Sequence, residues 1–194
     1  MIKLTDMKTR LLMWLLLLGS LWAGSVHAQV RYPKREFRGA WIQCVNGQFQ
    51  GMPTEKMKKV LVSQLDNLQK AGINAIIFQV RAEADALYKS PYEPWSRFLT
   101  GVQGKAPSPM WDPLQFMIEE CHKRNMELHA WINPYRAKTK GTGALSPMHP
   151  YNRHPEWFVQ YAGQLYFDPG LPESRKYICK IVRDIVNRYD VDAI

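Results

Sequence analysis

The chain has 194 residues, and its 26 Lys and Arg against 17 Asp and Glu give a formal net charge of +9 at pH 7. The basic residues are scattered and mostly follow helical surface spacings, which favours solvated helix faces over a stripe that binds nucleic acid. Cys44, Cys121 and Cys179 lie far apart without a CxxC pair, so the sequence signals neither a zinc cage nor a disulfide framework, although one disulfide among the three stays open.

Residues 1–28 have the order of a secretory signal peptide. Lys3, Lys8 and Arg10 precede the apolar run "LLMWLLLLGSLWAG", and small residues lead up to Ala28. This order predicts export to the periplasm or cell envelope with cleavage after Ala28. The alternative is a membrane anchor, but the uninterrupted apolar core is short for a span of roughly 20 residues. We therefore expect no stable membrane span after cleavage, a polar leader over 29–37 and one domain over 38–194.

The first half of that domain predicts two buried strands around an amphipathic helix. The first strand is expected over 37–46 and the second over 74–81, where "NAIIFQVR" is the continuous apolar run of a sheet covered on both faces. Between them, Thr54 is expected to cap a helix that Gly72 ends. The apolar stripe of this helix has the spacing of three and four: Met57, Val60, Leu61, Leu65 and Leu68.

The second half begins with a segment without a clear period, over 82–111, which contains four prolines and which we interpret as a long, functional loop. Asp112 and Pro113 are expected to begin a second helix. A third strand is predicted over 126–136, a short helix in "HPEWFVQYA" and a fourth strand over 163–170. A long amphipathic helix after Pro172 leads to "VDAI", which resembles the start of a fifth strand.

The alternation of strands and helices predicts an α/β protein with a parallel sheet. An open, doubly wound sheet and an eight-fold barrel both satisfy the pattern. No GxGxxG turn follows the first strand, which disfavours a nucleotide-binding sheet.

Functional groups in such folds follow the carboxyl ends of the strands. The residues at these positions are Trp41, Gln43, Asn46, Gln79, Arg81, Glu83, Asp85, His129, Trp131, Asn133, Tyr135, Arg136, Tyr166 and Asp168. Amides and guanidinium groups bind sugar hydroxyls, and aromatic faces cover the apolar side of a pyranose ring. Cleavage of a glycosidic bond needs two carboxyl groups. The set therefore indicates a site for a glycan.

Each candidate also has a structural interpretation. Glu83 and Asp85 could cap a helix or pair with Arg81, and Asp168 before Pro169 has the chemistry of a turn. The run from Asn133 to Arg136 is either a turn or part of the site. His149 and His154 have no partner at metal-ligand spacing, so we expect neither a metal nor a cofactor. No Gly-x-Ser-x-Gly motif is present, which disfavours a serine nucleophile.

Long stretches of the chain resemble the bacterial glycosyl hydrolase-like 10 family. They are "FRGAWIQCV", "NAIIFQVRAEADALYKSPYEPWSRFLTGVQG", "WDPLQFMIEECHKRNMELHAWINPYRA" and "YFDPGLPESRKYICKIVRDIVNRYDVDAI". The resemblance implies an exported (β/α)8 TIM barrel that acts on a cell-envelope glycan, with peptidoglycan strands favoured. It also implies that seven residues line the sugar cleft: Arg81, Asp85, Trp95, Asn133, Tyr135, Arg136 and Asp168.

Relatives continue after the motif "YDVDGI", where this chain has Ala193 in place of glycine. Since a complete barrel needs about 250 residues, we expect the N-terminal half only, with about four βα units and the start of strand 5, as a piece of the active enzyme.

The leading hypothesis is a glycosidase that hydrolyses O-glycosidic bonds with Asp85, Asp168 and Glu83 as catalytic candidates. Trp41, Trp95, Trp131 and Tyr135 would be sugar platforms. A non-catalytic glycan-binding envelope protein is the alternative.

Overall fold

The computed structural model of the protein describes residues 36–194. The predicted signal peptide and nearly all of the polar leader lie outside these residues, so both stay predictions. Among residues 36–194 no helix combines the length and the apolar character needed to cross a bilayer. All three cysteines are free, with Cys44 and Cys121 buried and Cys179 exposed.

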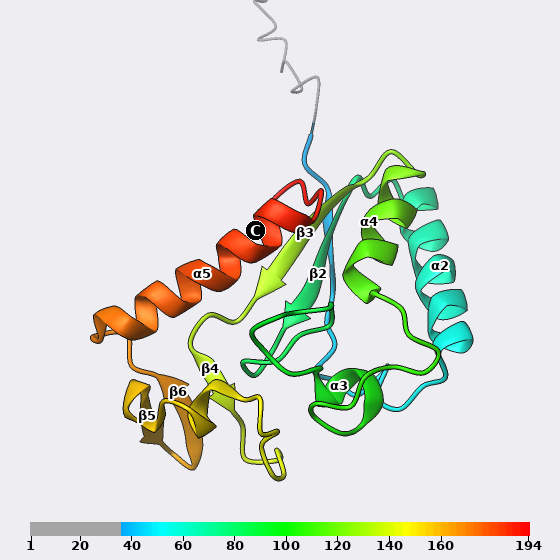
Figure 1. Ribbon diagram of the computed structural model, residues 1–194. Helices are drawn as coiled ribbons and strands as arrows, with labels where there is room; N and C mark the ends of the chain where they lie inside the picture. The colour runs from blue at the N-terminus through cyan, green and yellow to red at the C-terminus, as the bar shows by residue number, and fades with distance from the viewer. Residues whose placement is uncertain (1–35) are drawn as a thin grey trace, which may run out of the picture. The chain divides into compact units, whose positions relative to one another are not determined.

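The centre of the fold is a parallel sheet in the order β1-β2-β3 (Figure 1). Its strands are β1 (Gly39–Ile42), β2 (Ala75–Arg81) and β3 (Glu127–Ile132). The C-terminal residues extend this sheet, because Ala193 forms a parallel bridge with His129 and Ala130 N donates to its carbonyl oxygen at 2.8 Å. The parallel arrangement predicted from the apolar strands is confirmed.

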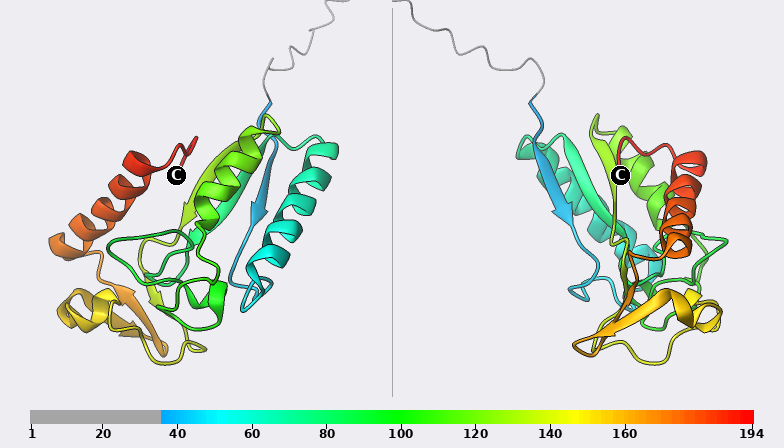
Figure 2. Two further views of the ribbon diagram at one scale, coloured as in Figure 1. Left: turned by 45° about the vertical axis from the view of Figure 1, so that its right-hand side comes forward. Right: turned by 90° about the vertical axis from the view of Figure 1, so that its left-hand side faces the viewer.

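Three long helices cover one side of the parallel sheet (Figure 2). They are α2 (Thr54–Lys70), α4 (Pro113–His122) and α5 (Pro172–Arg188). Ile42, Phe78 and Ala130, which are register partners on neighbouring strands, are buried in the same apolar core. The helices contribute Leu61, Met117 and Ile181 to that core. Their side chains follow the apolar periods of the sequence, which explains why these elements were predicted correctly.

The beginnings of the helices follow local chemistry with one exception. Asp112 caps α4 as expected, since its carboxylate accepts from the backbone N–H groups of Leu114 and Gln115. The predicted cap at Thr54 is wrong: Pro53 takes that position, and Thr54 is the first helical residue, with its hydroxyl directed to the carbonyl oxygen of Pro109 at 3.3 Å. The long loop over 82–111 is confirmed and contains only the short helix α3 (Arg97–Thr100).

The segment of the chain between β3 and α5 forms a second, antiparallel sheet in the order β4-β6-β5. The sheet consists of β4 (Arg136–Lys138), β5 (Phe158–Tyr161) and β6 (Gln164–Phe167). The single turns η1 (Pro150–Asn152) and η2 (Pro155–Trp157) lie between β4 and β5. Ala162 and Gly163 join β5 to β6 with positive φ angles of 48° and 74°, as a type I′ hairpin turn requires. The prediction of a short helix in "HPEWFVQYA" is therefore wrong after the single turn η2, because the residues that follow form β5.

The antiparallel sheet also corrects the predicted number of βα units. The segment 163–170 was predicted as the fourth parallel strand, but β6 pairs antiparallel with β4 and β5. The place beside β3 is taken by the segment around Ala193, which was predicted as the start of strand 5. Residues 36–194 thus contain three βα units and the beginning of a fourth strand, with the antiparallel sheet inserted after β3.

Candidate functional site

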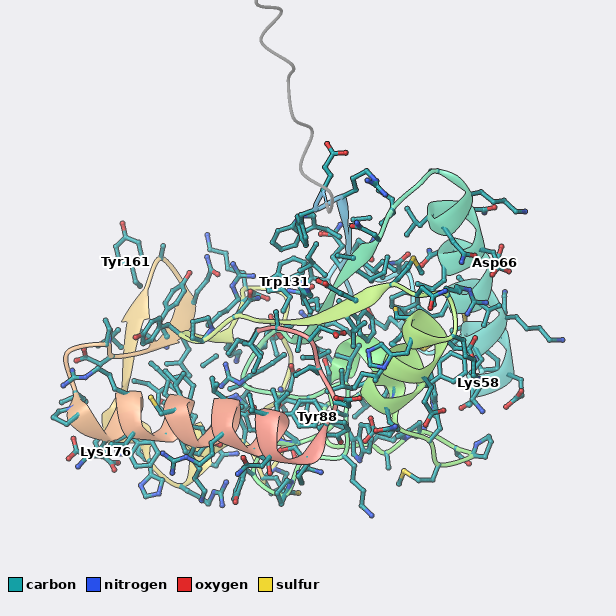
Figure 3. All side chains as sticks on the ribbon, turned by 90° about the horizontal axis from the view of Figure 1, so that it is seen from above. Lys58, Asp66, Tyr88, Trp131, Tyr161 and Lys176 are labelled. Carbon is teal, nitrogen blue, oxygen red and sulfur yellow. The ribbon has the colours of Figure 1, made fainter. Side chains whose placement is uncertain are left out.

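One face of the parallel sheet carries no helix, and two tryptophans lie on it. Side chains alternate along a strand, so Trp41 and Trp131 point away from the helices that cover Ile42 and Ala130. Figure 3 shows Trp131 on the side of β3 opposite α5. The two indole rings meet edge to face, with centroids 4.9 Å apart, and Trp41 is 67% exposed. This geometry leaves an aromatic surface open to a ligand.

The residues after β3 extend this aromatic surface. The Asn133 side chain accepts a hydrogen bond from Trp131 Nε1 at 3.0 Å and donates to the carbonyl oxygen of Ala82 at 3.2 Å. Tyr135 is 38% exposed, and Arg136 opens β4 opposite Tyr166. Trp131 and Asn133 are thus hydrogen-bonded where β3 leaves the sheet, and the partly exposed Tyr135 follows them in the chain.

Arg81 lies at the end of β2 and is completely buried. Its Nε and Nη2 donate to the two carboxylate oxygens of Glu93 at 2.7 Å each, and its Nη1 donates to the backbone carbonyl oxygens of Asn133 at 2.6 Å and Pro134 at 3.2 Å. Burial disfavours the charged form, but the Glu93 carboxylate outweighs it and raises the pKa of Arg81. These bonds direct Arg81 toward protein groups, where it holds two loops together.

Glu83 is the first of two buried carboxyl groups in the loop after β2. It forms an ion pair with Arg97 at 2.9 Å and accepts hydrogen bonds from the hydroxyls of Thr139 and Thr142. Burial raises the pKa of Glu83, but these hydrogen bonds outweigh burial and lower it below its usual value. Glu83 is therefore ionised near neutral pH and joins the 82–111 loop to the loop after β4.

Asp85 is the second buried carboxyl group. It accepts from the backbone N–H of Glu83 at 3.1 Å and from Gln103 Nε2 at 3.3 Å. Burial raises the pKa of Asp85 to about 6, and the nearby negative charge of Glu83 adds to this shift. Two carboxyl groups with pKa values moved in opposite directions are typical of acid–base sites, but neither of these two has exposed surface.

Asp168 and Trp95 occupy other positions. Asp168 follows β6, is partly exposed, and its Oδ1 accepts from the Gly170 N–H at 2.7 Å, which is the turn geometry that the sequence left open. Trp95 is partly buried and forms a parallel bridge with Ala86 inside the 82–111 loop. Asp168 is thus the one catalytic candidate of the three that reaches the surface.

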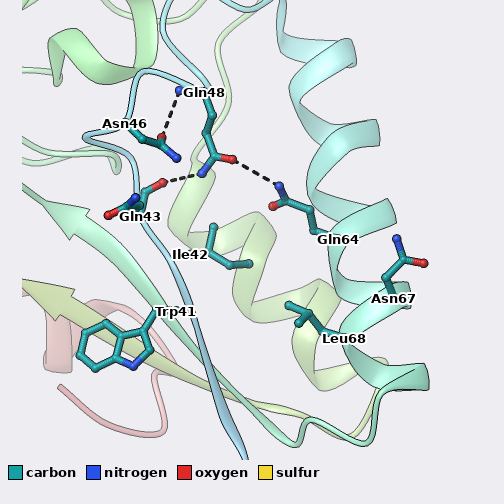
Figure 4. Close-up of a pocket in the computed structure, with 8 residues that line it drawn as sticks. All are labelled: Trp41, Ile42, Gln43, Asn46, Gln48, Gln64, Asn67 and Leu68. Carbon is teal, nitrogen blue, oxygen red and sulfur yellow. Dashed lines mark hydrogen bonds between the residues drawn. The ribbon is translucent and has the colours of Figure 1, made fainter.

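A cavity of about 590 Å³ lies between β1 and α2 and shares Trp41 with the open face of the sheet (Figure 4). Its wall contains linked amides: Gln64 Nε2 donates to Gln48 Oε1 at 3.3 Å, and Gln48 Nε2 donates to the Gln43 carbonyl oxygen at 2.5 Å. Amide side chains beside an indole have the chemistry of a carbohydrate contact.

The partners of the buried charges were missed by the sequence analysis. They are Glu93, Arg97, Gln103, Thr139 and Thr142. Three of them lie in the long 82–111 loop, and its length was the signal that this segment has a role. Both ring nitrogens of His149 bond to protein groups: its Nδ1 accepts from the Tyr151 N–H, so Nε2 donates to the carbonyl oxygens of Glu83 and Ala137. Residues 36–194 contain no group of three side chains that could hold a metal ion.

The arrangement of parallel βα units is that of glycosidases built on TIM barrels. A maltogenic α-amylase AmyB from Thermotoga neapolitana matches 81% of this chain and 38% of its own with a TM-score of 0.52 and 19% identity. An α-L-fucosidase isoenzyme 2 from Paenibacillus thiaminolyticus matches 81% of this chain and 23% of its own with a TM-score of 0.54 and 14% identity. At these identities the similarity concerns the fold alone.

The chain belongs to the glycosyl hydrolase-like 10 family, whose model matches residues 36–194. Glycosyl hydrolase YngK of Bacillus subtilis is 47% identical over 166 residues, which cover 82% of this chain and 32% of YngK. Glycosyl hydrolase DigH of Escherichia coli K12 is 37% identical over 155 residues, which cover 73% of this chain and 35% of DigH. The chain thus spans about a third of the length of these curated relatives.

Proposed function

We propose that the protein acts on a polysaccharide of the cell envelope as a glycoside hydrolase, with the glycan strands of peptidoglycan as the favoured substrate. The observation that carries the proposal is the aromatic surface of Trp41 and Trp131 next to Asn133 and Tyr135 at the carboxyl ends of the strands. The relatives named glycosyl hydrolases support the reaction class. Residues 1–28 contain Lys3, Lys8, Arg10 and Asp6, so cleavage after Ala28 would leave a net charge of 9 − 2 = +7, which suits an anionic polymer. The predicted signal peptide supports export to the periplasm or cell envelope.

The proposed reaction uses one protonated and one ionised carboxyl group on opposite sides of the bond that is cleaved. Asp85, with its pKa raised to about 6 by burial, has the protonation behaviour of a general acid. Asp168 is the partly exposed candidate, which supports its role as the ionised carboxylate in this proposal. Glu83 supports the loop arrangement through Arg97 and Thr142.

The alternative is a glycan-binding protein without catalysis, and a specific observation favours it for this chain. Glu83 and Asp85 have no exposed surface, and the hydrogen bonds of both carboxylates go to protein groups. Binding needs only the tryptophans, Asn133 and Tyr135, all of which retain exposed surface.

The two functions are separated by measuring binding and cleavage on the same samples. Purified chain is incubated with glycan strands free of stem peptides; the bound fraction is measured by co-sedimentation and new reducing ends by mass spectrometry. The enzyme predicts cleavage that falls at least 100-fold in Asp85→Asn or Asp168→Asn, with binding retained. Binding without cleavage by the unchanged chain supports the alternative, and the absence of both contradicts a glycan function.

A further inference from the structure

Gln79 on β2 has a buried side chain whose hydrogen bonds are only half satisfied. Gln79 has no exposed surface. Its side-chain Oε1 accepts hydrogen bonds from Cys44 N at 3.0 Å and from Cys44 Sγ at 3.4 Å. Its Nε2 has no hydrogen-bond partner among the residues that the structure describes. Buried amide groups without partners are rare because each loses its bonds to water.

The orientation of this amide follows from the chemistry of Cys44. A backbone N–H can only donate, so the atom that faces Cys44 N must be the oxygen of the Gln79 side chain and cannot be its nitrogen. The NH₂ group of Gln79 therefore points away from Cys44, and its two N–H groups lack acceptors.

The register of the strands places Gln79 on the same face of the sheet as the aromatic surface. Gln79 is the register partner of Trp131, and Ile77, two residues earlier on the same face, is the register partner of Trp41. Trp41 and Trp131 are in contact with each other. One buried donor thus lies on the same face of the sheet as two indole rings, the combination of polar and aromatic groups that a pyranose ring requires.

We propose that Gln79 is a substrate-binding residue that donates a hydrogen bond to an acceptor oxygen of the sugar ring held against Trp41 and Trp131. This inference rests on the proposed function and adds to it the residue that selects for an acceptor at one position of the ring. Cys44 is a positioning residue, because its N–H fixes the amide oxygen and so directs the NH₂ group. Trp41 is 67% exposed, so a sugar ring can contact this surface from solvent.

The test compares Gln79→Glu with the unchanged chain and with Gln160→Glu, which makes the same chemical change at an exposed position of β5. Glutamate keeps an acceptor for Cys44 N but has no N–H donors. The ligands are a soluble tetramer of β-1,4-linked N-acetylglucosamine and, as a glycan without acetamido groups, maltotetraose. Kd is measured by calorimetry, folding by thermal unfolding, and the side-chain NH₂ signals by ¹⁵N-resolved NMR.

We expect Gln79→Glu to bind its preferred tetramer about tenfold more weakly, as the loss of one hydrogen bond predicts, while Gln160→Glu binds like the unchanged chain. The NH₂ signals that are missing in Gln79→Glu should shift in the unchanged chain when the tetramer is added. A Kd that is unaltered in Gln79→Glu, or NH₂ signals that do not move at saturation, overturns the role of Gln79 alone. Absence of binding of either tetramer by the unchanged chain overturns the proposed function and this subsite with it.

Discussion

Two regions of the molecule are held together by different forces. The parallel region, made of β1, β2, β3, α2 and α4, has a core of apolar side chains such as Leu61, Phe78 and Met117, all without exposed surface. The loop region, residues 82–111 and 133–171, buries charges in addition to apolar side chains such as Leu87 and Phe167, with Glu83 paired to Arg97 and Glu93 paired to Arg81 of β2. The stability of the first region comes from apolar area that is removed from water. The stability of the second also requires that each buried charge keeps its counter-charge.

The largest expected effect comes from the buried ion pair that joins Arg81 of β2 to Glu93 of the loop region. Arg81→Met leaves the Glu93 carboxylate buried without a counter-charge, which is expected to lower the free energy of unfolding by about 3–5 kcal/mol. Chemical denaturation measures this loss. The control is Lys123→Met, which breaks the pair of this largely exposed lysine with Glu120, leaves Glu120 paired to Arg124, and is expected to cost less than about 1 kcal/mol. Equal effects of the two substitutions would contradict the distinction between the regions.

The double variant Arg81→Met/Glu93→Leu sharpens the same comparison. Since it removes both charges, it should recover a large part of the stability that Arg81→Met loses. A double variant as unstable as the single one would assign the loss to packing around Arg81.

A substitution in the apolar core of the parallel region is expected to lower the free energy of unfolding slightly less than Arg81→Met does. Leu61→Ala removes a fully buried side chain of α2 and leaves a cavity, with an expected loss of about 2–5 kcal/mol in the free energy of unfolding. This loss should not depend on pH or salt. Lys56→Ala on the exposed side of the same helix is the control, with a change of about 0.5 kcal/mol or less.

The loop region should also respond to pH through Asp85. Its pKa is raised to about 6 in the folded chain, above the value of the unfolded chain, so between pH 4 and 6 the folded state holds a proton that the unfolded state has released. Stability from this group therefore falls as pH rises through that window, by about 2–3 kcal/mol for a shift of two units. Glu83, with a lowered pKa, acts in the opposite direction at more acidic pH.

Thermal unfolding at pH 4 and pH 7 measures this effect by comparing the unchanged chain with Asp85→Asn. The variant has no titrating group at this position, so its stability should decline less between the two pH values. Parallel pH profiles would show that Asp85 does not carry the raised pKa.

The smallest expected effect concerns the cap of α4, whose Asp112 also accepts from the backbone N–H of Lys89 in the loop region at 2.9 Å. Asp112 caps α4 and accepts a hydrogen bond from the Tyr189 hydroxyl at 2.6 Å. Asp112→Ala should lower the free energy of unfolding by about 1–2 kcal/mol, which denaturation at neutral pH measures. Asp112→Asn keeps an acceptor for the helix N–H groups and should retain most of the stability; an equal loss in both variants would argue against capping as the cause.

The outcome of the sequence predictions follows the same division. α2 was predicted because Met57, Leu61 and Leu65 follow a helical period, and β2 because its short, continuous apolar run is typical of a parallel strand. The antiparallel pairing of β6 with β4 and β5 was not predicted. The reason is that "QLYF" has the same strand propensity in a parallel and in an antiparallel sheet. The two-residue connection Ala162-Gly163 was the available signal, since a parallel connection needs a much longer crossover.

The sequence by itself determined the family resemblance, the three long helices and the parallel strands, because these depend on local periods and on motifs within one stretch of chain. Only the tertiary structure decided that Ala193 pairs with His129, that Glu83 and Asp85 are buried, and that the Gln79 amide lacks a partner. Strand partners, burial and hydrogen-bond satisfaction depend on residues far apart in the chain, such as Glu83 with Thr142 and Cys44 with Gln79. No pattern within a single segment contains that information.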